Sequence, residues 1–231
     1  MKKQIIEKIK KNPLAKILIV KIKNYYIKKS AFKNSKDYWI TRYSRGGNSG
    51  VGSYDKFAEF KADVINYFVK DKKIERVIEF GCGDGNQLKY FGFKEYIGFD
   101  ISHKALDICK NIFKNDNSKS FILLKNFQNQ KGDLTISLDV IYHLIEDEVF
   151  NEYMNRLFFS SLKYVIIYAS NSTDYNSEKI PHVKHRKFSD WIEVHHPEFV
   201  LIKQIQNKYP YNGDYLKSSF SDFFIYEKKQ N

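Results

Sequence analysis

Short apolar runs alternate with amphipathic segments along most of the chain. Apolar residues recur at helical spacing in three stretches, residues 55–70, 103–113 and 146–162. Between them lie short apolar runs of the kind that buried strands use, at residues 77–80, 96–100, 121–124, 133–139 and 164–168. Strands that alternate with helices predict an α/β fold built on a doubly wound, mostly parallel sheet.

Two further strand-like runs lie near the end of the chain, at residues 199–207 and 220–227. The segment between them shows no evident crossover helix. Two strands joined in this way predict a hairpin, so the last strand should be antiparallel. The pattern as a whole predicts a sheet of seven strands, mostly parallel, with an antiparallel C-terminal hairpin strand.

The first predicted strand leads directly into a glycine turn, Glu79-Phe-Gly-Cys-Gly-Asp-Gly-Asn86. Glycine allows positive φ and lets a ligand approach the backbone closely. A short helical pattern resumes at Asn86. Strand, glycine turn and helix together predict a cradle for a nucleotide-like ligand, with free backbone N–H groups at the helix start.

An acid ends the next predicted strand. Asp100 lies 19 residues after Gly81, near the usual spacing for a carboxylate that binds a ribose diol. The turn lacks the G-x-G-x-x-G pattern of dinucleotide-binding enzymes, and Glu79 stands two positions before its first glycine. This E-x-G-x-G-x-G strand end, together with Asp84 and Asp100, resembles class I S-adenosylmethionine (SAM) dependent methyltransferases.

The resemblance implies a three-layer, Rossmann-like methyltransferase domain over residues 37–231. SAM would be its cofactor and S-adenosylhomocysteine (SAH) its product. Asp100 would bind the ribose, Ile101 would pack on the adenine, and Asp139 would lie beside the sulfonium and the acceptor. The cofactor-binding residues implied are Arg42, Tyr43, Glu79, Gly81, Cys82, Gly83, Asp84, Gly85, Asn86, Asp100, Ile101, Ser102 and Asp139.

Residues 37–54 combine aromatic, cationic and glycine residues. Four of the 11 glycines lie between positions 46 and 52, and no Gly-Lys-Ser/Thr follows, so this is not a P-loop. Such a segment is typical of a lid that closes over a cofactor and excludes water. Arg42 or Tyr43 would then reach the methionine carboxylate. A solvated linker is the alternative.

Candidate catalytic residues follow the fourth predicted strand. His143 lies four residues after Asp139, and a histidine there would act as general base towards an acceptor hydroxyl. A histidine that caps a helix or bonds within the wall is the alternative. After the third strand, where many members of the class carry an acid for the adenine amino group, Asn126 or Gln128 would have to substitute.

A basic stretch, Pro-His-Val-Lys-His-Arg-Lys, occupies residues 181–187. Arg186, with Lys184 or Lys187, would hold a phosphate or carboxylate of the substrate. A metal site that uses His182 and His185 with Asp139 or His143, and a solvated loop, are the alternatives. The predicted substrate-binding residues are Tyr54, His182, His185 and Arg186, and no metal is predicted.

The net charge of +12 is concentrated at the N-terminus. Residues 1–36 hold 12 lysines and one acid and so carry +11, whereas the remaining 27 basic and 26 acidic residues leave +1. This predicts a basic amphipathic helical extension over residues 1–36. Residues 1–30 would dock on an anionic membrane surface, or pack on the domain with their lysines solvated. A nearly neutral body disfavours nucleic acid as a partner.

Only two cysteines, Cys82 and Cys109, are present, and no disulfide framework is implied. No apolar run approaches the roughly 20 residues of a membrane span. We therefore expect a cytoplasmic location, with contact to the inner membrane through residues 1–30 as a further option. The sequence predicts no oligomeric state.

Three features bear on the acceptor. Residues 138–141, Leu-Asp-Val-Ile, replace the Asn/Asp-Pro-Pro-Tyr/Phe motif of DNA amino-methylating enzymes, and no cysteine nucleophile follows this strand. The motifs at residues 38–43, 46–54, 79–88 and 182–188 resemble bacterial capsule and lipopolysaccharide methyltransferases. The resemblance implies O-methylation of a sugar, or of a phosphate-bearing or nucleotide-activated precursor of a surface polysaccharide. An RNA methyltransferase that uses the basic N-terminus and a non-catalytic SAM-binding protein are the alternatives.

Overall fold

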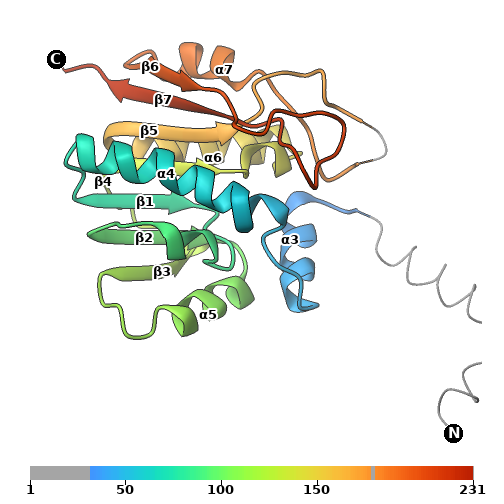
Figure 1. The fold of residues 1–231 in the computed structure, drawn as a ribbon, viewed down its shortest axis with the longest axis horizontal. Coiled ribbons are helices and arrows are strands. Elements are labelled where there is room, and N and C mark those ends of the chain that lie inside the picture. Colours follow the sequence, from blue (N-terminus) through green and yellow to red (C-terminus); the bar gives the residue numbers. More distant parts are fainter. Residues whose placement is uncertain (1–31, 178–179, 231) are drawn as a thin grey trace, which may run out of the picture. The chain divides into compact units, whose positions relative to one another are not determined.

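The computed structural model describes residues 32–177 and 180–230 (Figure 1). The chain divides into two compact units, Met1–Lys33 and Asn34–Asn231, and the fold described below is that of the second. Most of the predicted basic helix over residues 1–36 lies outside the described residues. Its docking to a membrane therefore stays a prediction.

In the described part of the chain, seven strands form one sheet in the order β3-β2-β1-β4-β5-β7-β6 (Figure 1). Strands β1 to β5 run parallel, whereas β7 pairs antiparallel with both β5 and β6. The predicted mostly parallel sheet with an antiparallel C-terminal hairpin is confirmed. The strands are β1 (Arg76–Phe80), β2 (Glu95–Asp100), β3 (Lys119–Leu123), β4 (Gly132–Leu138), β5 (Ser161–Ala169), β6 (Phe199–Ile205) and β7 (Asp222–Lys228).

Helices cover both faces of the sheet and give it three layers. Side chains of α4 (Asp55–Asp71) and α5 (His103–Ile112) pack on one face, and those of α6 (Asp147–Phe159) and α7 (Phe188–His195) pack on the other. The alternation of side chains along a strand serves both layers. In β1, for example, Val77 belongs to the core beneath α4, whereas Ile78 and Phe80 belong to the core beneath α6.

The helix α3 (Ser35–Ser44) occupies the first half of the segment predicted as a lid. It lies beyond the carboxyl ends of β1 and β2 (Figure 1). Asn34 caps it, because its side-chain oxygen accepts the Asp37 N–H at 2.7 Å. The rest of the segment contains a turn and the 3₁₀ turn η1 (Val51–Ser53).

Two connections between helices and strands have distinct local causes. The helix predicted over residues 146–162 ends at Phe159, because Ser161 already pairs with Gly132 in the sheet. Between β3 and β4 the fully described chain forms only the 3₁₀ turn η3 (Leu124–Asn126) and no crossover helix. The Phe127 ring covers this part of the sheet instead, with its centroid 5.4 Å from that of Phe99.

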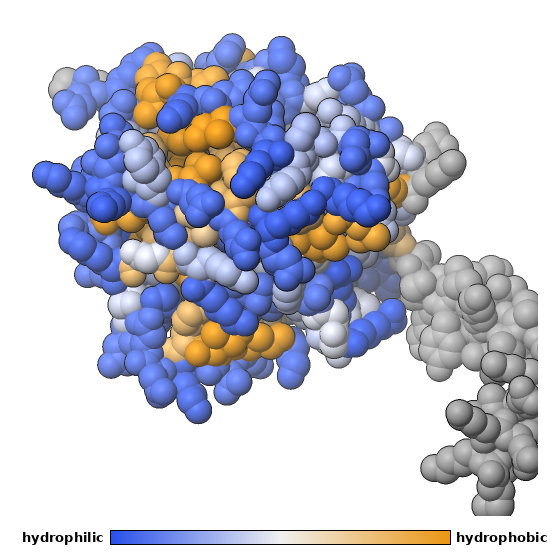
Figure 2. All heavy atoms as spheres, in the orientation of Figure 1, coloured by the Kyte–Doolittle hydropathy of each residue, from blue (hydrophilic) through white to orange (hydrophobic). Residues whose placement is uncertain are grey.

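The edge strand β6 exposes apolar side chains, which include Val200, Leu201 and Ile202. Figure 2 shows several separate apolar patches among polar residues on the visible face of the molecule. A register shift between Leu201 and Lys203 interrupts the pairing with β7. A bulge and a lysine are devices that hinder pairing of an edge with another sheet. Among the described helices, none combines the length and the apolar character needed to cross a bilayer.

Gly85 provides a test of the glycine turn. Its φ is +73°, and a Cβ would lie 2.9 Å from Cys109 Sγ and 3.2 Å from the Phe113 ring. We expect Gly85→Ala to lower the free energy of unfolding by about 1–3 kcal/mol, measured by chemical denaturation.

The matched control is Gly92→Ala. Apart from its two chain neighbours, no described residue has an atom within 4 Å of a Cβ at Gly92, and its φ is not positive. Its effect should stay below about 1 kcal/mol. Equal losses in the two variants would contradict the steric requirement at Gly85.

Candidate active site

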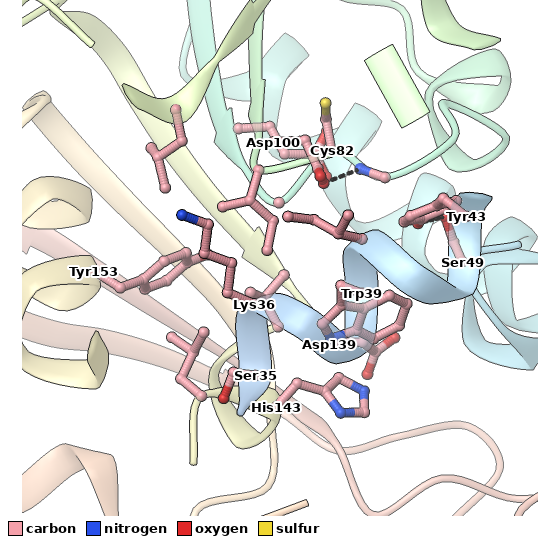
Figure 3. A pocket seen from close by; sticks show the side chains of 18 of the residues that line it. Ser35, Lys36, Trp39, Tyr43, Ser49, Cys82, Asp100, Asp139, His143 and Tyr153 are labelled. Carbon is pink, nitrogen blue, oxygen red and sulfur yellow. Dashed lines mark hydrogen bonds between the residues drawn. The ribbon is translucent and has the colours of Figure 1, made fainter. Parts of the chain in front are cut away.

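A cavity of about 530 Å³ lies at the carboxyl ends of β1, β2 and β4, beneath α3 (Figure 3). Its size is within the range of roughly 300–1,000 Å³ typical of small-molecule sites. We call its buried lining residues the floor; they include Glu79, Cys82, Asp84, Gln87 and Asp100. We call its exposed rim the mouth; it includes Lys36, Lys125 and Glu152, with the half-buried Arg156 beside them.

The glycine turn is shaped by contacts with the protein's own chain. Gly81, Gly83 and Gly85 all have positive φ. A Cβ on Gly81 would lie 2.6 Å from the Val140 side chain, and one on Gly83 would lie 2.3 Å from Ser49 Oγ. The absence of a side chain at Gly83 therefore allows Ser49 of the lid segment to pack directly against the glycine turn.

Two buried carboxylates face the cavity from the ends of β1 and β2. Glu79 accepts the Tyr96 hydroxyl at 2.5 Å, and burial raises the pKa of Glu79 to about 7 even though Tyr96 and Lys61 act to lower it. Asp100 accepts the backbone N–H groups of Gly83 at 3.0 Å and Ser102 at 2.8 Å (Figure 3). Burial nevertheless raises the pKa of Asp100 to about 6.

The lid segment is fixed at both ends. At its start, the Ser35 N–H and hydroxyl donate to the Glu146 carboxylate at 3.0 and 2.5 Å. At its end, the Ser49 N–H donates to Asp84 at 2.9 Å, and the Asp84 N–H donates to Ser49 Oγ at 3.0 Å. The Tyr54 hydroxyl donates to the same Asp84 carboxylate. Asp84 thus holds the lid on the glycine turn.

Asp139, directly after β4, is surrounded by hydrogen-bond donors. Lys61 Nζ lies 2.8 Å from Oδ2, and the hydroxyls of Tyr142 and Ser221 donate to Oδ1 at 2.9 and 3.0 Å. The Lys61 side chain is wholly buried. The carboxylate therefore joins α4, the end of β4 and the start of β7, and a direct catalytic role for it stays a prediction.

His143 lines the cavity from the 3₁₀ turn η4 (Ile141–His143). Its Nδ1 lies 3.0 Å from the carbonyl oxygen of His182. A carbonyl can only accept, so Nδ1 carries the proton and Nε2 has the free lone pair. No described residue bonds to Nε2. Burial lowers the pKa of His143 to about 4, so the ring is neutral at physiological pH.

Nine of the 13 predicted cofactor residues, all of them described, line the cavity: Tyr43, Glu79, Gly81, Cys82, Gly83, Asp84, Asp100, Ile101 and Asp139. The other four support the lining from behind. Arg42 Nε donates to the Asn48 carbonyl within the lid at 2.6 Å. Asn86 bonds the Ser53 carbonyl, Ser102 caps α5, and Gly85 makes room for Cys109.

The predicted substrate residues lie outside the lining. Tyr54 bonds Asp84, and His182 stacks on Tyr38 with ring centroids 4.4 Å apart. His185 is buried against Ser170, and burial lowers its pKa to about 4. Arg186 donates to the carbonyls of Leu144 and Ile145 and to Asp147. Their contact with a substrate stays a prediction. Across the described residues, no group of three or more His, Cys, Asp and Glu could hold a metal ion.

The structure adds lining residues that are not among the predicted site residues. α3 contributes Ser35, Lys36, Trp39 and Ile40, and α6 contributes Val149, Glu152, Tyr153 and Arg156. After β3, Leu123, Leu124 and Lys125 line the cavity, whereas Asn126 and Gln128 do not. One signal was available for Lys61: it occupies a position on the apolar face of α4 formed by Phe57, Val64 and Phe68.

A family model described as a methyltransferase domain matches residues 54–198. The chain belongs to this methyltransferase family. The sequence-based resemblance to methyltransferases is thereby confirmed at the level of the family, whereas the likeness to capsule and lipopolysaccharide enzymes stays a prediction. No curated protein sequence matches the chain significantly.

Solved structures of methyltransferases share the fold. The N-methyltransferase NodS from Bradyrhizobium japonicum WM9, in complex with SAH, is 11% identical with a TM-score of 0.64, over 86% of this chain and 100% of that one. Magnesium protoporphyrin IX methyltransferase from Synechocystis PCC 6803, with bound SAM, is 15% identical with a TM-score of 0.59. The match covers 87% of this chain and 99% of that one. The methyltransferase domain of bacterial CtHen1 is 19% identical with a TM-score of 0.52. The match covers 74% of this chain and 98% of that one.

The floor of this methyltransferase fits SAM. Its buried carboxylates suit a ribose diol and a ligand that carries a sulfonium and an ammonium. Gln87 adds an independent observation, because its Oε1 is buried and has no hydrogen-bond partner among the described residues. Its Nε2 donates to the Ala58 carbonyl at 2.8 Å, which fixes the amide and leaves Oε1 to accept from a ligand. The lining residues and the comparisons agree on SAM as the cofactor.

Asp100 provides the test of cofactor binding. We expect Asp100→Ala to raise the dissociation constant of SAH at least tenfold, because it removes a charged acceptor for the ribose hydroxyls. Calorimetry on the folded variant measures this. Asp107→Ala, which removes an exposed acid of α5, should leave the constant unchanged. An unchanged affinity of the folded Asp100→Ala variant for SAH would contradict the expected contact between Asp100 and the ribose.

Glu79 provides a test of pH dependence. Its pKa is raised from 4.5 to about 7, so the folded state binds its proton more tightly than the unfolded chain does. The stability from this proton is present below about pH 4.5 and is lost as the pH rises through 7. Relative to Glu79→Gln, the wild-type protein without cofactor should therefore lose about 2–3 kcal/mol between pH 4.5 and 8.

Denaturation curves of wild type, Glu79→Gln and the control Glu59→Gln, collected at both pH values, measure the difference. Glu59 is an exposed acid of α4, so its variant should follow the wild type. A Glu79→Gln curve that also follows the wild type would show that Glu79 titrates normally.

Proposed function

We propose that the protein is a SAM-dependent O-methyltransferase. Its acceptor is a hydroxyl of a sugar, or of a phosphate-bearing or nucleotide-activated precursor of a bacterial surface polysaccharide. The observation that carries the reaction type is His143, whose backbone-fixed Nδ1–H leaves a free Nε2 lone pair on a ring that lines the cavity. The motif resemblance supports the acceptor class, because the fold itself hosts several acceptors.

SAM supplies an electrophilic methyl group on a sulfonium when it is bound. The protein then has three tasks: it must align the acceptor, exclude water and accept a proton. The Glu79 and Asp100 carboxylates, with Oε1 of Gln87, hold the cofactor on the floor. Tyr43 and Trp39 of α3 cover it, which keeps the reacting atoms away from bulk water.

A weak base suffices at His143. Methyl transfer places positive charge on the acceptor oxygen, and the proton of such an oxygen is strongly acidic. With a pKa of about 4, His143 is unprotonated at pH 7 and can accept that proton. The Trp39 ring meets the His143 ring at 4.9 Å in an edge-to-face contact, which holds the imidazole in place.

His143 therefore provides the kinetic test. We expect His143→Ala to lower kcat for methyl transfer by about 10²–10⁴ while the SAM dissociation constant changes less than threefold. Radiolabelled methyl transfer to sugars, sugar phosphates and nucleotide-activated sugars gives kcat, and calorimetry gives the affinity. The acid limb of the wild-type profile should lie near pH 4, where His143 becomes protonated.

The matched control is His195→Ala, which removes an exposed histidine that stacks on Trp191 outside the cavity. It should keep full activity. A fully active His143→Ala, or transfer to amines or RNA in place of hydroxyls, would overturn the proposal. Transfer to no acceptor despite tight SAM binding would favour a cofactor-binding protein.

A further inference from the structure

The cavity separates its charges by depth. The acids Glu79, Asp84 and Asp100 lie on the buried floor. Three cationic side chains lie at the mouth, and they come from three different elements: Lys36 from α3, Lys125 from η3 and Arg156 from α6. Basic groups that far-apart segments bring to one opening form a site that the sequence could not indicate.

Few carboxylates of the protein neutralise the positive charges at the mouth. Arg156 pairs with Glu152, one turn earlier on α6. No carboxylate of the described residues forms an ion pair with Lys36 or Lys125. The Lys36 amine points into the cavity, in front of Tyr153, rather than away from it (Figure 3). Positive charge is therefore left over at the opening.

The local fold explains why the opening exists. In the fully described connection between β3 and β4, the turn η3 is the only helical element, and its Leu124 and Lys125 line the cavity. The side chain of Lys125 is exposed on this turn. Arg156 lies beside the same connection, with its guanidinium carbon 5.9 Å from the Phe127 ring centroid. The opening is therefore lined by α3, η3 and α6 together.

The cofactor does not account for these cations. If the ribose binds Asp100, as the resemblance implies, the methionine moiety, which carries the only carboxylate of SAM, would lie at the glycine turn on the floor. Its adenine is uncharged. The mouth cations are left for the other substrate, which has to reach His143.

The spacing on α3 connects the mouth with the reacting centre. Lys36 and Trp39 are three residues apart and lie on the same face of the helix. Trp39 contacts the His143 ring. An acceptor can therefore place a hydroxyl at His143 and an anionic group near Lys36 within the span of a small molecule.

We propose that Lys36, Lys125 and Arg156 form a subsite for the phosphoryl group of a phosphorylated acceptor. This inference rests on the proposed function and narrows its acceptor to the phosphate-bearing class. The two lysines act as point charges, and the planar arginine provides paired donors for phosphoryl oxygens. The group comes from a sugar phosphate or from a nucleotide-activated sugar, and the experiment separates the two.

The test is calorimetry on the full chain, with and without saturating SAH. The probes are inorganic pyrophosphate, glucose 1-phosphate, UDP-glucose and, as the uncharged match, glucose. We expect the three phosphates to bind and glucose to fail. Lys36→Met/Lys125→Met should weaken phosphate binding at least tenfold, and 0.5 M NaCl should weaken it in the wild type. The tighter of glucose 1-phosphate and UDP-glucose identifies the source of the group.

The matched control is Lys70→Met/Lys208→Met, which removes two exposed lysines outside the cavity lining. It should bind the phosphates like the wild type. Equal weakening by both double variants, or no phosphate binding by wild type that binds SAH, would overturn the subsite and leave the methyltransferase intact. Failure of SAH to bind would count against the proposed function, while the titrations without SAH still decide the subsite.

Discussion

The ion pair between the buried Lys61 and Asp139 holds the carboxyl end of the sheet together. Through it, α4 is attached to the end of β4, and Asp139 also binds Tyr142, directly before His143, and Ser221, directly before β7. The lid passes so close that a Cβ on Gly52 would lie 2.7 Å from the Asp139 carboxylate. A buried pair adds little net stability, but the loss of one partner leaves an uncompensated charge. Its role is to fix where four segments meet.

The buried acids of the floor lower the stability of the empty protein, and ligand binding offsets this loss. Burial raises the pKa of both Glu79 and Asp100, so their ionised forms weaken the empty fold at neutral pH. A cationic ligand supplies the missing opposite charge. Binding then stabilises the folded state by mass action. The same residues therefore limit the stability of the empty protein and provide the affinity of the loaded one.

Features encoded by neighbouring residues could be predicted from the sequence. The strands, the terminal hairpin and the glycine turn with Glu79 and Asp100 each follow from local periodicity or motif spacing, and the fold agrees with them. Features that depend on contacts between residues far apart in the chain could not be predicted from the sequence. The lid helix α3 is anchored by Glu146, 111 residues after Ser35, and the orientation of Gln87 depends on a carbonyl of α4.

The same reasoning explains where residue roles were hard to infer. Arg186 is predicted to bind an anion because of its basic stretch, and the sequence does not indicate that its donors bond to Leu144, Ile145 and Asp147. Lys36 and Lys125 belong to no motif, and only the folded chain shows that both line one cavity. A charge count along the sequence cannot distinguish a cation that bonds to neighbouring segments from one that lines a cavity.

The arrangement of floor and mouth also bears on the order in which ligands bind and leave. The acids of the floor are buried, whereas Lys36 and Lys125 of the rim are exposed, so a molecule on the floor has to pass the rim to enter or leave. An acceptor bound at the rim, as proposed above, would block that passage. The cofactor would then bind first and its demethylated form would leave last, so the depth of the cavity would impose an ordered kinetic sequence.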